Sequence, residues 1–301
     1  MDQAHLLSPL RYPGSKRRLA SYIKQALEIN CFKPELYVEA FVGGGSVALQ
    51  LLQSALVEKI ILIDRDPWVA SFWQTVFFDT EWLIDRIETA VVSLDVWTAM
   101  KASTPQSVRE QAWACFFLNR TSFSGILEQR VGPLGGRSQE SAYKIDCRFQ
   151  RQTQIGRIQK IAAFRNQVAA IWSMSWDQGL EKIHQEQGLG KLPTNNVFFY
   201  FDPPFFEKAD ALYRFYFKDK DHLQLRDALL NLQDKWILSY DSAAQVEALY
   251  GAAIQANTNG TIKHEIELFY SLSVMQERVR GKEVLLSNLD KLPAWDETST
   301  R

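Results

Sequence analysis

The chain has 301 residues, of which 46% are hydrophobic, and its formal net charge is −1. This length and composition are typical of a folded protein with one sizeable core and room for a small inserted or appended domain. No window approaches the roughly 18 consecutive apolar residues that span a bilayer, and no cationic start precedes a long apolar run, so we expect a soluble, cytoplasmic protein without a membrane partner.

The cysteines and histidines do not indicate a metal site or a disulfide framework. The three cysteines, Cys31, Cys115 and Cys147, are odd in number, and no two have the Cys-x-x-Cys spacing. Paired disulfides and structural zinc are therefore not expected. Because the four histidines are scattered without a partner pattern, we assign them no catalytic role and expect no metal.

The charge is unevenly distributed. Residues 1–24 contain five Lys/Arg against one Asp/Glu, a net charge of +4, and residues 101–170 contain eleven against four, a net charge of +7. Two basic segments on a nearly neutral protein indicate either a surface that follows nucleic-acid phosphates or ordinary solvated helix faces.

Apolar runs bounded by turn residues alternate with amphipathic stretches over most of the chain. Helical patterns cover residues 46–56, 68–78 and 222–232, and such alternation predicts βα units around a mainly parallel sheet. The candidate strands are Leu36–Phe41, Lys59–Asp64, Ala169–Ser175, Val197–Asp202, Lys235–Tyr240, Glu265–Leu272 and Glu283–Ser287.

A glycine turn, Gly43-Gly-Gly45, follows the first candidate strand and opens a helix. Glycines allow the backbone to approach a ligand, and the N–H groups of the new helix face it. The next strand ends in Asp64, from which a carboxylate can hold ribose hydroxyls. Together these features predict a nucleoside-containing cofactor. Because Gly43-x-Gly45-x-x-Ala48 also fits the dinucleotide fingerprint, NAD and S-adenosylmethionine both remain open here.

The interval from about residue 95 to residue 165 interrupts the strand and helix alternation. It is basic, contains Gly132-Pro-Leu-Gly-Gly136, and has weaker apolar periodicity. We therefore predict an inserted module at 96–165, a parent domain formed by 1–95 and 166–290, and a polar tail at 291–301.

The run from Val197 to Phe201 is apolar or aromatic throughout and ends in Asp202-Pro203-Pro204-Phe205. It predicts a strand buried on both faces, which the prolines end because they cannot donate to the ladder. A carboxylate and a nearby aromatic at the carboxyl end of a parallel strand could bind the amino group of a flat ring. An ordinary strand-to-turn exit is the alternative.

Short motifs that follow one another along most of the chain resemble those of a known family, the Dam-type DNA adenine-N6 methyltransferases, which use S-adenosylmethionine. The matching motifs are Leu10-Arg-Tyr12-Pro-Gly14-Ser-Lys16, Phe41-x-Gly43-x-Gly45 with Asp64, Leu118-Asn119-Arg120-Thr-Ser-Phe123-Ser124-Gly125, Asp202-Pro-Pro-Phe205, Ser239-Tyr-Asp241 and Lys282-Glu283-Val-Leu-Leu.

The resemblance implies an α/β, Rossmann-like S-adenosylmethionine-dependent methyltransferase fold with a mainly parallel seven-stranded sheet and a mostly helical DNA-recognition insert. The implied reaction transfers a methyl group to N6 of an adenine flipped out of duplex DNA. Such an enzyme is bacterial or phage-encoded. Its implied partners are double-stranded DNA and, in a restriction system, a cognate endonuclease that acts separately.

The resemblance also implies roles for particular residues at the cofactor. Asp64 would bind the ribose, the Phe41–Gly45 loop would contact the methionine portion, and Asp177 would contact the adenine, although an ordinary surface turn also explains this acid. The full set implied for the cofactor is Tyr12, Gly14, Lys16, Phe41, Gly43, Gly45, Asp64 and Asp177.

The target base would lie at Asp202, Pro203, Pro204 and Phe205. Hydrogen bonds from the amine to the Asp202 carboxylate and the Pro203 carbonyl would favour a pyramidal N6 that attacks the methyl group in line. The family most often has tyrosine at the last position, and Phe205 keeps its stacking face without the hydroxyl.

For DNA contact the resemblance implies a segment of the insert that includes an aromatic wedge. Phe123 matches this aromatic, although a core role is the alternative. Glu128 stands where readers of GATC have an arginine for guanine, so we expect another recognition sequence, unless Arg130 takes that place. The full set implied for DNA is Asn119, Arg120, Phe123, Ser124, Glu128 and Arg130.

Other functions remain as alternatives. A cytosine-N4 methyltransferase uses similar geometry, although the acid at Asp202 favours adenine. A DNA-binding regulator on an inactive methyltransferase scaffold would need no turnover. An NAD-dependent oxidoreductase would leave the Asp202–Phe205 motif and the basic insert without a role.

Overall fold

The structure is a computed structural model that describes residues 6–11, 16–206, 209–241, 243–271 and 278–295. Its centre is a seven-stranded sheet in the order β3-β2-β1-β4-β5-β7-β6. Strands β1 to β5 are parallel, whereas β7 runs antiparallel to β5 and to β6. The bounds are β1 Leu36–Glu39, β2 Lys59–Asp64, β3 Val168–Ser173, β4 Val197–Phe201, β5 Lys235–Tyr240, β6 Ile262–Ser271 and β7 Arg278–Ser287.

This arrangement confirms the predicted mainly parallel sheet, and each of the seven candidate strands overlaps an observed one. Leu272, at the end of one candidate strand, lies outside the described residues. The strand order reverses between β1 and β4, where Val38 pairs with Ile61 on one side and Phe199 on the other. Such a switch point is where open α/β sheets bind ligands, beyond the carboxyl ends of the strands.

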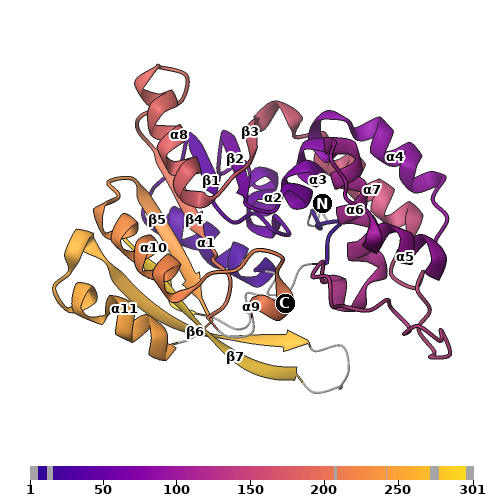
Figure 1. Cartoon of the computed structure of the whole chain (residues 1–301). Coiled ribbons are helices and arrows are strands. Elements are labelled where there is room, and N and C mark those ends of the chain that lie inside the picture. The colour runs from indigo at the N-terminus through magenta and orange to yellow at the C-terminus, as the bar shows by residue number, and fades with distance from the viewer. Residues whose placement is uncertain (1–5, 12–15, 207–208, 242, 272–277, 296–301) are drawn as a thin grey trace.

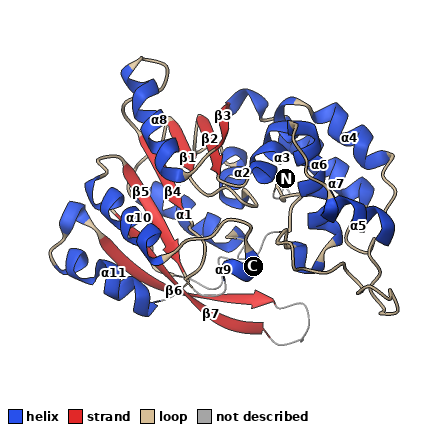
Figure 2. Cartoon of the chain, viewed as in Figure 1, coloured by secondary structure: helices blue, strands red, loops and turns tan. Residues whose placement is uncertain are grey.

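Alternate residues of the central strands pack into two separate hydrophobic clusters, one on each face of the sheet. Tyr37, Phe198 and Tyr200 belong to one cluster, and Val38 and Phe199 belong to the other. Every residue of β4 is buried, as expected for a strand covered on both faces. Figure 2 shows the sheet between layers of helices.

Apart from α1, which precedes β1, the helices of the parent fold connect successive strands. The first cluster packs α1 Arg17–Ile29, α2 Ser46–Gln53 and α3 Pro67–Phe78, and the second packs α8 Trp176–Gly188, α10 Asp219–Asn231 and α11 Ala243–Gln255. A short helix, α9 Ala209–Leu212, follows β4. The predicted helices at 46–56, 68–78 and 222–232 all overlap observed ones.

The chain segment that connects β2 to β3 forms a group of helices. This group lies at the β3 edge of the sheet (Figure 1). After α3 it contains α4 Thr80–Glu88, α5 Leu94–Ala102, α6 Val108–Thr121, a 3-10 turn at Phe123–Gly125, and α7 Arg151–Ala162; a second 3-10 turn, Arg165–Gln167, precedes β3. Phe116 and Ile158 from these helices belong to the same cluster as Tyr37 and Phe198 of the sheet. The insert predicted at 96–165 therefore shares its core with the sheet.

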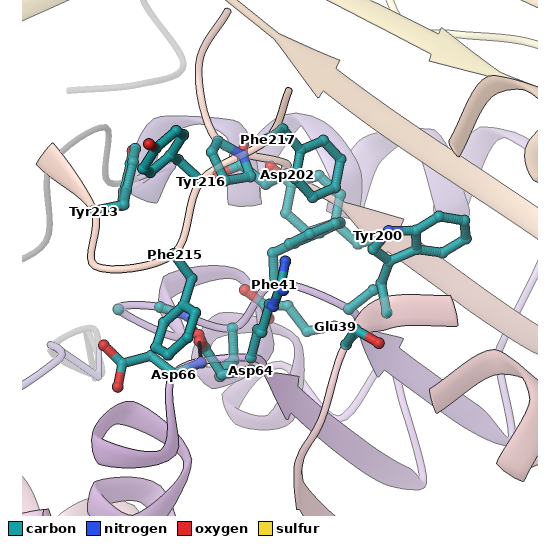
Figure 3. A pocket seen from close by; sticks show the side chains of 18 of the residues that line it. Glu39, Phe41, Asp64, Asp66, Tyr200, Asp202, Tyr213, Phe215, Tyr216 and Phe217 are labelled. Atoms are coloured by element: carbon teal, nitrogen blue, oxygen red, sulfur yellow. Dashed lines mark hydrogen bonds between the residues drawn. The ribbon is translucent and has the colours of Figure 1, made fainter. Parts of the chain in front are cut away.

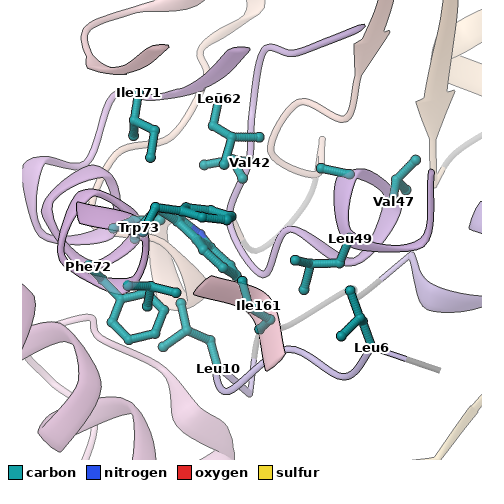
Figure 4. Packing of buried hydrophobic residues seen from close by; sticks show 14 of the residues in the cluster. Leu6, Leu10, Val42, Val47, Leu49, Leu62, Phe72, Trp73, Ile161 and Ile171 are labelled. Atoms are coloured by element: carbon teal, nitrogen blue, oxygen red, sulfur yellow. The ribbon is translucent and has the colours of Figure 1, made fainter. Parts of the chain in front are cut away.

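Both ends of the described chain pack onto this core. Leu6 and Leu10 lie in the first cluster with Trp73 of α3 and Ile161 of α7 (Figure 4). Near the other end, Leu292 and Trp295 pack against the same cluster, and the Trp295 ring lies 5.9 Å from that of Tyr22. The polar tail predicted for 291–301 thus begins with packed residues, and residues 296–301 lie outside the described chain.

Neither a membrane span nor a metal cluster is found among the described residues. They contain no helix that is both long and apolar enough to cross a bilayer. They also contain no group of three or more His, Cys, Asp or Glu side chains placed to hold a metal ion.

Candidate functional site

A cavity opens at the carboxyl ends of β1, β2 and β4, next to the switch point of the sheet. Its volume is about 250 Å³, just below the range of about 300–1,000 Å³ for typical ligand pockets. Figure 3 shows Tyr213 and Phe217 across the cavity from Asp64 and Asp66. Its wall contains Lys16, Glu39, the loop from Phe41 to Ser46, Asp64–Asp66, Ser175–Asp177, Asp202, Pro204 and Tyr213–Phe217.

The glycine loop is held tightly against α3. Gly43 and Gly45 have φ values of 42° and 61°, in the left-handed region that favours glycine. A Cβ atom on Gly45 would lie 2.7 Å from Cζ2 of Trp73, and the Trp73 indole donates to the Gly43 carbonyl at 2.9 Å. The loop therefore needs glycine for its conformation and, at Gly45, for space.

Asp64, at the end of β2, connects this loop to the next turn. Its carboxylate accepts hydrogen bonds from the backbone N–H of Gly43 at 2.9 Å and of Asp66 at 2.8 Å. Burial, followed by the charge of Asp66, raises the pKa of Asp64 to about 7. A ligand hydroxyl could add a further donor to this carboxylate in the cavity wall.

Glu39 is a buried acid in the cavity wall to which the sequence pattern gave no role. It accepts hydrogen bonds from the Ala48 backbone N–H, in the first turn of α2, at 2.8 Å and from the Tyr37 hydroxyl at 3.0 Å. Burial raises the pKa of Glu39 to about 8. An ionisable residue within a buried apolar strand was the available signal, because such residues are rarely buried unless they are partnered.

Asp202 lies directly after β4 and is 22% exposed to solvent. Its Oδ1 accepts a hydrogen bond from the Ser239 hydroxyl on β5 at 2.7 Å and lies 2.9 Å from Nζ of Lys16. Lys16 also lies 3.4 Å from Glu283 on β7. These contacts bring together four of the motifs that are far apart in the sequence.

Phe205, which follows the two prolines, lies beside Lys16 and Tyr213 and is not among the residues that line the cavity. The Phe205 ring packs edge to face against Tyr213 at 5.9 Å, and Nζ of Lys16 lies 5.4 Å from its centroid. Pro203 is buried, while Pro204 lines the cavity. A planar ring next to Asp202 would meet an aromatic surface and a carboxylate together.

The segment from Tyr213 to Phe217 is bound to the carboxyl end of β2 by an ion pair. Nη1 of Arg214 lies 2.8 Å from Asp66, and its guanidinium stacks on Trp68 at 3.7 Å. Asp66 also caps α3 by accepting from the Trp68 N–H at 2.9 Å. Burial raises the pKa of Asp66, and Arg214 opposes that shift. The sequence motifs pointed to neither residue of this pair.

The predicted cofactor residues that the structure describes surround one cavity. Lys16, Phe41, Gly43, Gly45, Asp64 and Asp177 all line it. Phe41 packs edge to face against Phe217 at 5.5 Å. Tyr12 and Gly14, predicted from the same motif as Lys16, lie outside the described residues.

The residues predicted to contact DNA fall into two groups. Asn119 and Arg120 are buried, and their side chains donate to backbone carbonyls, so the structure gives them a role in holding the insert together. Phe123 is 47% exposed and precedes Ser124, whose φ is 53°.

The carboxylate of Glu128 is bound by the nearby Arg130. Its carboxylate accepts from the Arg130 backbone N–H at 2.7 Å and lies 3.2 Å from Nε of the same arginine. The Arg130 side chain is 65% exposed and also donates to the Asp210 carbonyl on α9 at 2.5 Å.

Comparison with known proteins agrees with this geometry. The family described as D12 class N6 adenine-specific DNA methyltransferase matches residues 12–259. The chain belongs to this family. It is therefore an adenine-specific DNA methyltransferase, which takes the methyl group from a donor and uses DNA as its substrate.

The other comparisons add little. No curated protein matches the chain. Among solved structures, the precorrin 8w decarboxylase of Methanobacterium thermoautotrophicum is similar over 88% of each chain, with 12% identity and a TM-score of 0.30. A likeness this weak carries no conclusion about this methyltransferase.

Proposed function

We propose that this methyltransferase transfers the methyl group of S-adenosylmethionine to N6 of an adenine that is flipped out of duplex DNA. The observation that carries the proposal is a single cavity that reaches from the glycine loop and Asp64 to Asp202. A nucleoside cofactor at one end and a target amine at the other could therefore meet in one enclosed space.

The residues present fit this cofactor. Gly45 lets the loop beside the cavity pack against Trp73, where a Cβ atom would collide with the indole ring, and Asp64 presents a carboxylate suited to ribose hydroxyls. Asp202 adds a carboxylate to the same wall. S-adenosylmethionine would supply an electrophilic methyl group on a positively charged sulfur, and a carboxylate in the wall suits that charge.

The target amine would lie at Asp202. We propose that this carboxylate and the Pro203 carbonyl accept hydrogen bonds from the two N6–H groups, which makes the nitrogen pyramidal and reduces the delocalisation of its lone pair into the ring. Lys16 and Ser239 both hold Oδ1 of Asp202, so they fix the orientation of the carboxylate before substrate arrives. Phe205 and Tyr213 would pack around the adenine ring.

The test is methyl transfer by the purified protein. We expect transfer of label from S-adenosylmethionine to unmethylated duplex DNA, with N6-methyladenine as the product after nucleoside analysis. S-adenosylhomocysteine should raise the unfolding temperature, whereas NAD should leave it unchanged. Failure to make N6-methyladenine on DNA of varied sequence would refute the proposal.

Asp202→Ala tests the role of the carboxylate. We expect transfer to fall at least about 100-fold while S-adenosylhomocysteine still binds, because the acceptor for the amine is removed and the glycine loop and Asp64 remain. Asp227→Ala removes an exposed carboxylate on α10 and is the matched control, for which unchanged turnover is expected. Equal turnover in both variants would remove Asp202 from the mechanism.

We also propose that the recognition sequence differs from GATC, because Glu128 occupies the position where readers of GATC have an arginine that contacts guanine. Its contacts with Arg130 place a charged pair at this position. Methylation-sensitive sequencing of DNA from a host that expresses the chain would give the sequence read, and GATC methylation would contradict the proposal. A separate endonuclease cutting the same unmethylated sequence would identify a restriction system.

A further inference from the structure

The two basic segments seen in the sequence meet in the folded protein. Residues 6–11 run along α6 and α7, where Arg157 donates to the Ser8 carbonyl at 3.2 Å and Arg120 donates to the Pro9 carbonyl at 3.3 Å. The fold thereby joins positive charge from residues 1–24 to positive charge from residues 101–170.

Four arginines gather at this junction. Besides its bond to Pro9, the Arg120 guanidinium donates to the Arg148 carbonyl at 2.7 Å. Burial, followed by the charges of Arg11, Arg157 and Arg148, lowers the pKa of Arg120 to about 9. Burial and the charge of Arg148 likewise lower the pKa of Arg11. Arg11, Arg148 and Arg157 thus each repel the charge of Arg120, and Arg148 also repels that of Arg11.

No described carboxylate forms an ion pair with Arg11, Arg120 or Arg148. Nη1 of Arg11 is buried and has no hydrogen-bond partner in the described part of the chain, while the Arg148 residue is exposed. A buried donor without an acceptor is costly, and like charges add to the cost. An anion that binds between these side chains would accept a hydrogen bond from the unsatisfied donor and would reduce the repulsion between the like charges.

We propose that Arg11 and Arg148, with Arg120 and Arg157 behind them, bind one phosphodiester group of the DNA backbone; this inference rests on the proposed function. Guanidinium groups bind phosphate oxygens through paired, charge-assisted hydrogen bonds. A backbone phosphate is the anion that every DNA substrate brings, so the site would serve affinity and position.

The place of the site in the fold indicates which phosphate it would take. Asn119 accepts from the Arg11 N–H at 2.7 Å and donates to both the Arg11 carbonyl and the Gly125 carbonyl at 2.8 Å. A Cβ atom on Gly125 would lie only 2.3 Å from the Arg11 carbonyl. Arg11 is thus fixed directly behind the turn that carries the exposed Phe123. A phosphate held there would lie next to the flipped nucleotide.

The experiment measures DNA affinity as a function of salt concentration for Arg148→Gln and for the Arg11→Gln, Arg148→Gln double variant. We expect weaker binding of all DNA sequences alike, and a slope of log K against log salt that is smaller by about 1 for each phosphate that the variant no longer binds. Arg165→Gln is the matched control, because Arg165 is exposed, basic and beyond the end of α7. Its slope should equal that of the original protein.

A neutral-phosphate scan then locates the bound phosphate. Replacing single phosphates near the target adenine by methylphosphonates should weaken binding of the original protein at one position, and this position should lose its effect in the double variant. An unchanged salt slope in the double variant, or a scan that is identical in both proteins, would overturn the proposal. If inorganic phosphate but not DNA stabilises the original protein against heat, and the double variant loses this effect, the site binds a small anion. That result would overturn the DNA assignment.

These outcomes differ from failure of the proposed function. S-adenosylhomocysteine binding and the unfolding temperature of each variant report whether the fold and the cofactor site are intact. The original protein could transfer no methyl group and still bind DNA with a salt slope that decreases in the arginine variants. In that case the phosphate site would be supported and the proposed methyl transfer would be refuted.

Discussion

At the residue scale, Gly45 shows how one missing side chain shapes the cofactor end of the cavity. It is left-handed, and Trp73 occupies the space where a Cβ atom would lie. Gly136 is also left-handed, with φ of 74°, but has nothing within 4 Å of its would-be Cβ atom. Substitution of these two glycines therefore separates the free-energy cost of backbone strain, present at both, from the cost of steric crowding, present at Gly45.

We expect Gly45→Ala to lower the free energy of unfolding by more than Gly136→Ala does. Strain alone costs about 1–2 kcal/mol at either site, and Gly45→Ala must also displace the Trp73 ring. S-adenosylhomocysteine binding should weaken in Gly45→Ala alone. Urea unfolding and calorimetric titration measure both effects, and equal losses of stability in the two variants would contradict the crowding argument.

Glu39 leads to a prediction about pH. Its pKa is raised from 4.5 to about 8, so between pH 6.5 and 8 the folded state still binds a proton that the unfolded state has lost. Stability should therefore fall as pH rises through this window, by about 1–2 kcal/mol. His222, whose pKa is lowered to about 4, changes stability mainly below pH 6.5. Asp64, whose pKa is raised to about 7, gives a slope of the same sign up to about pH 7, so the part of the slope between about pH 7 and 8 belongs mainly to Glu39.

Glu39→Gln should remove most of the pH dependence between about pH 7 and 8, because an amide does not titrate, whereas the share of Asp64 below about pH 7 should remain. Urea unfolding of the ligand-free protein at several pH values between 6.5 and 8 measures the slope. Glu88→Gln changes an exposed glutamate and should leave the slope in place. A slope that persists unchanged in Glu39→Gln would show that another group causes it.

At the element scale, the segment after α9 joins the two ends of the cavity. Tyr213 packs on Phe205 near Asp202, and the next residue, Arg214, pairs with Asp66 near Asp64. We therefore expect this ion pair to help hold the aromatic segment against the cavity.

We expect Arg214→Gln to raise the Kd for S-adenosylhomocysteine about tenfold through faster release, because Asp66 loses its buried partner and the segment loses its anchor. Stopped-flow dissociation measures the rate. Arg226→Gln breaks an exposed pair with Asp227 and is the matched control, with no change expected. The same dissociation rate in both variants would mean that the segment is held by its aromatic contacts instead.

At the scale of the whole molecule, the sheet and the helices between β2 and β3 share one core. Phe116 of α6 stacks on Phe72 of α3 at 6.1 Å and packs edge to face against Phe149. Such continuity predicts that the insert and the sheet unfold together.

Phe116→Ala should destabilise the entire protein by about 3–5 kcal/mol and keep a single unfolding transition. Phe123→Ala removes the same ring from an exposed position, so it should change stability little and reduce methyl transfer instead. Urea unfolding followed by fluorescence and circular dichroism compares the two. A separate early transition in Phe116→Ala, with S-adenosylhomocysteine still bound, would show an independent insert.

The amino-acid sequence by itself determined the strands, the glycine turn and the acids at the strand ends, because apolar periodicity and turn chemistry are local properties. Its ordered motifs also led to the family, and the adenine-specific match disfavours the cytosine-N4, regulator and oxidoreductase alternatives. Only the tertiary structure decided which residues meet: Lys16 with Asp202, Arg214 with Asp66, and Arg11 with Arg120. It also buried Asn119 and Arg120, because burial depends on elements that pack from distant parts of the chain.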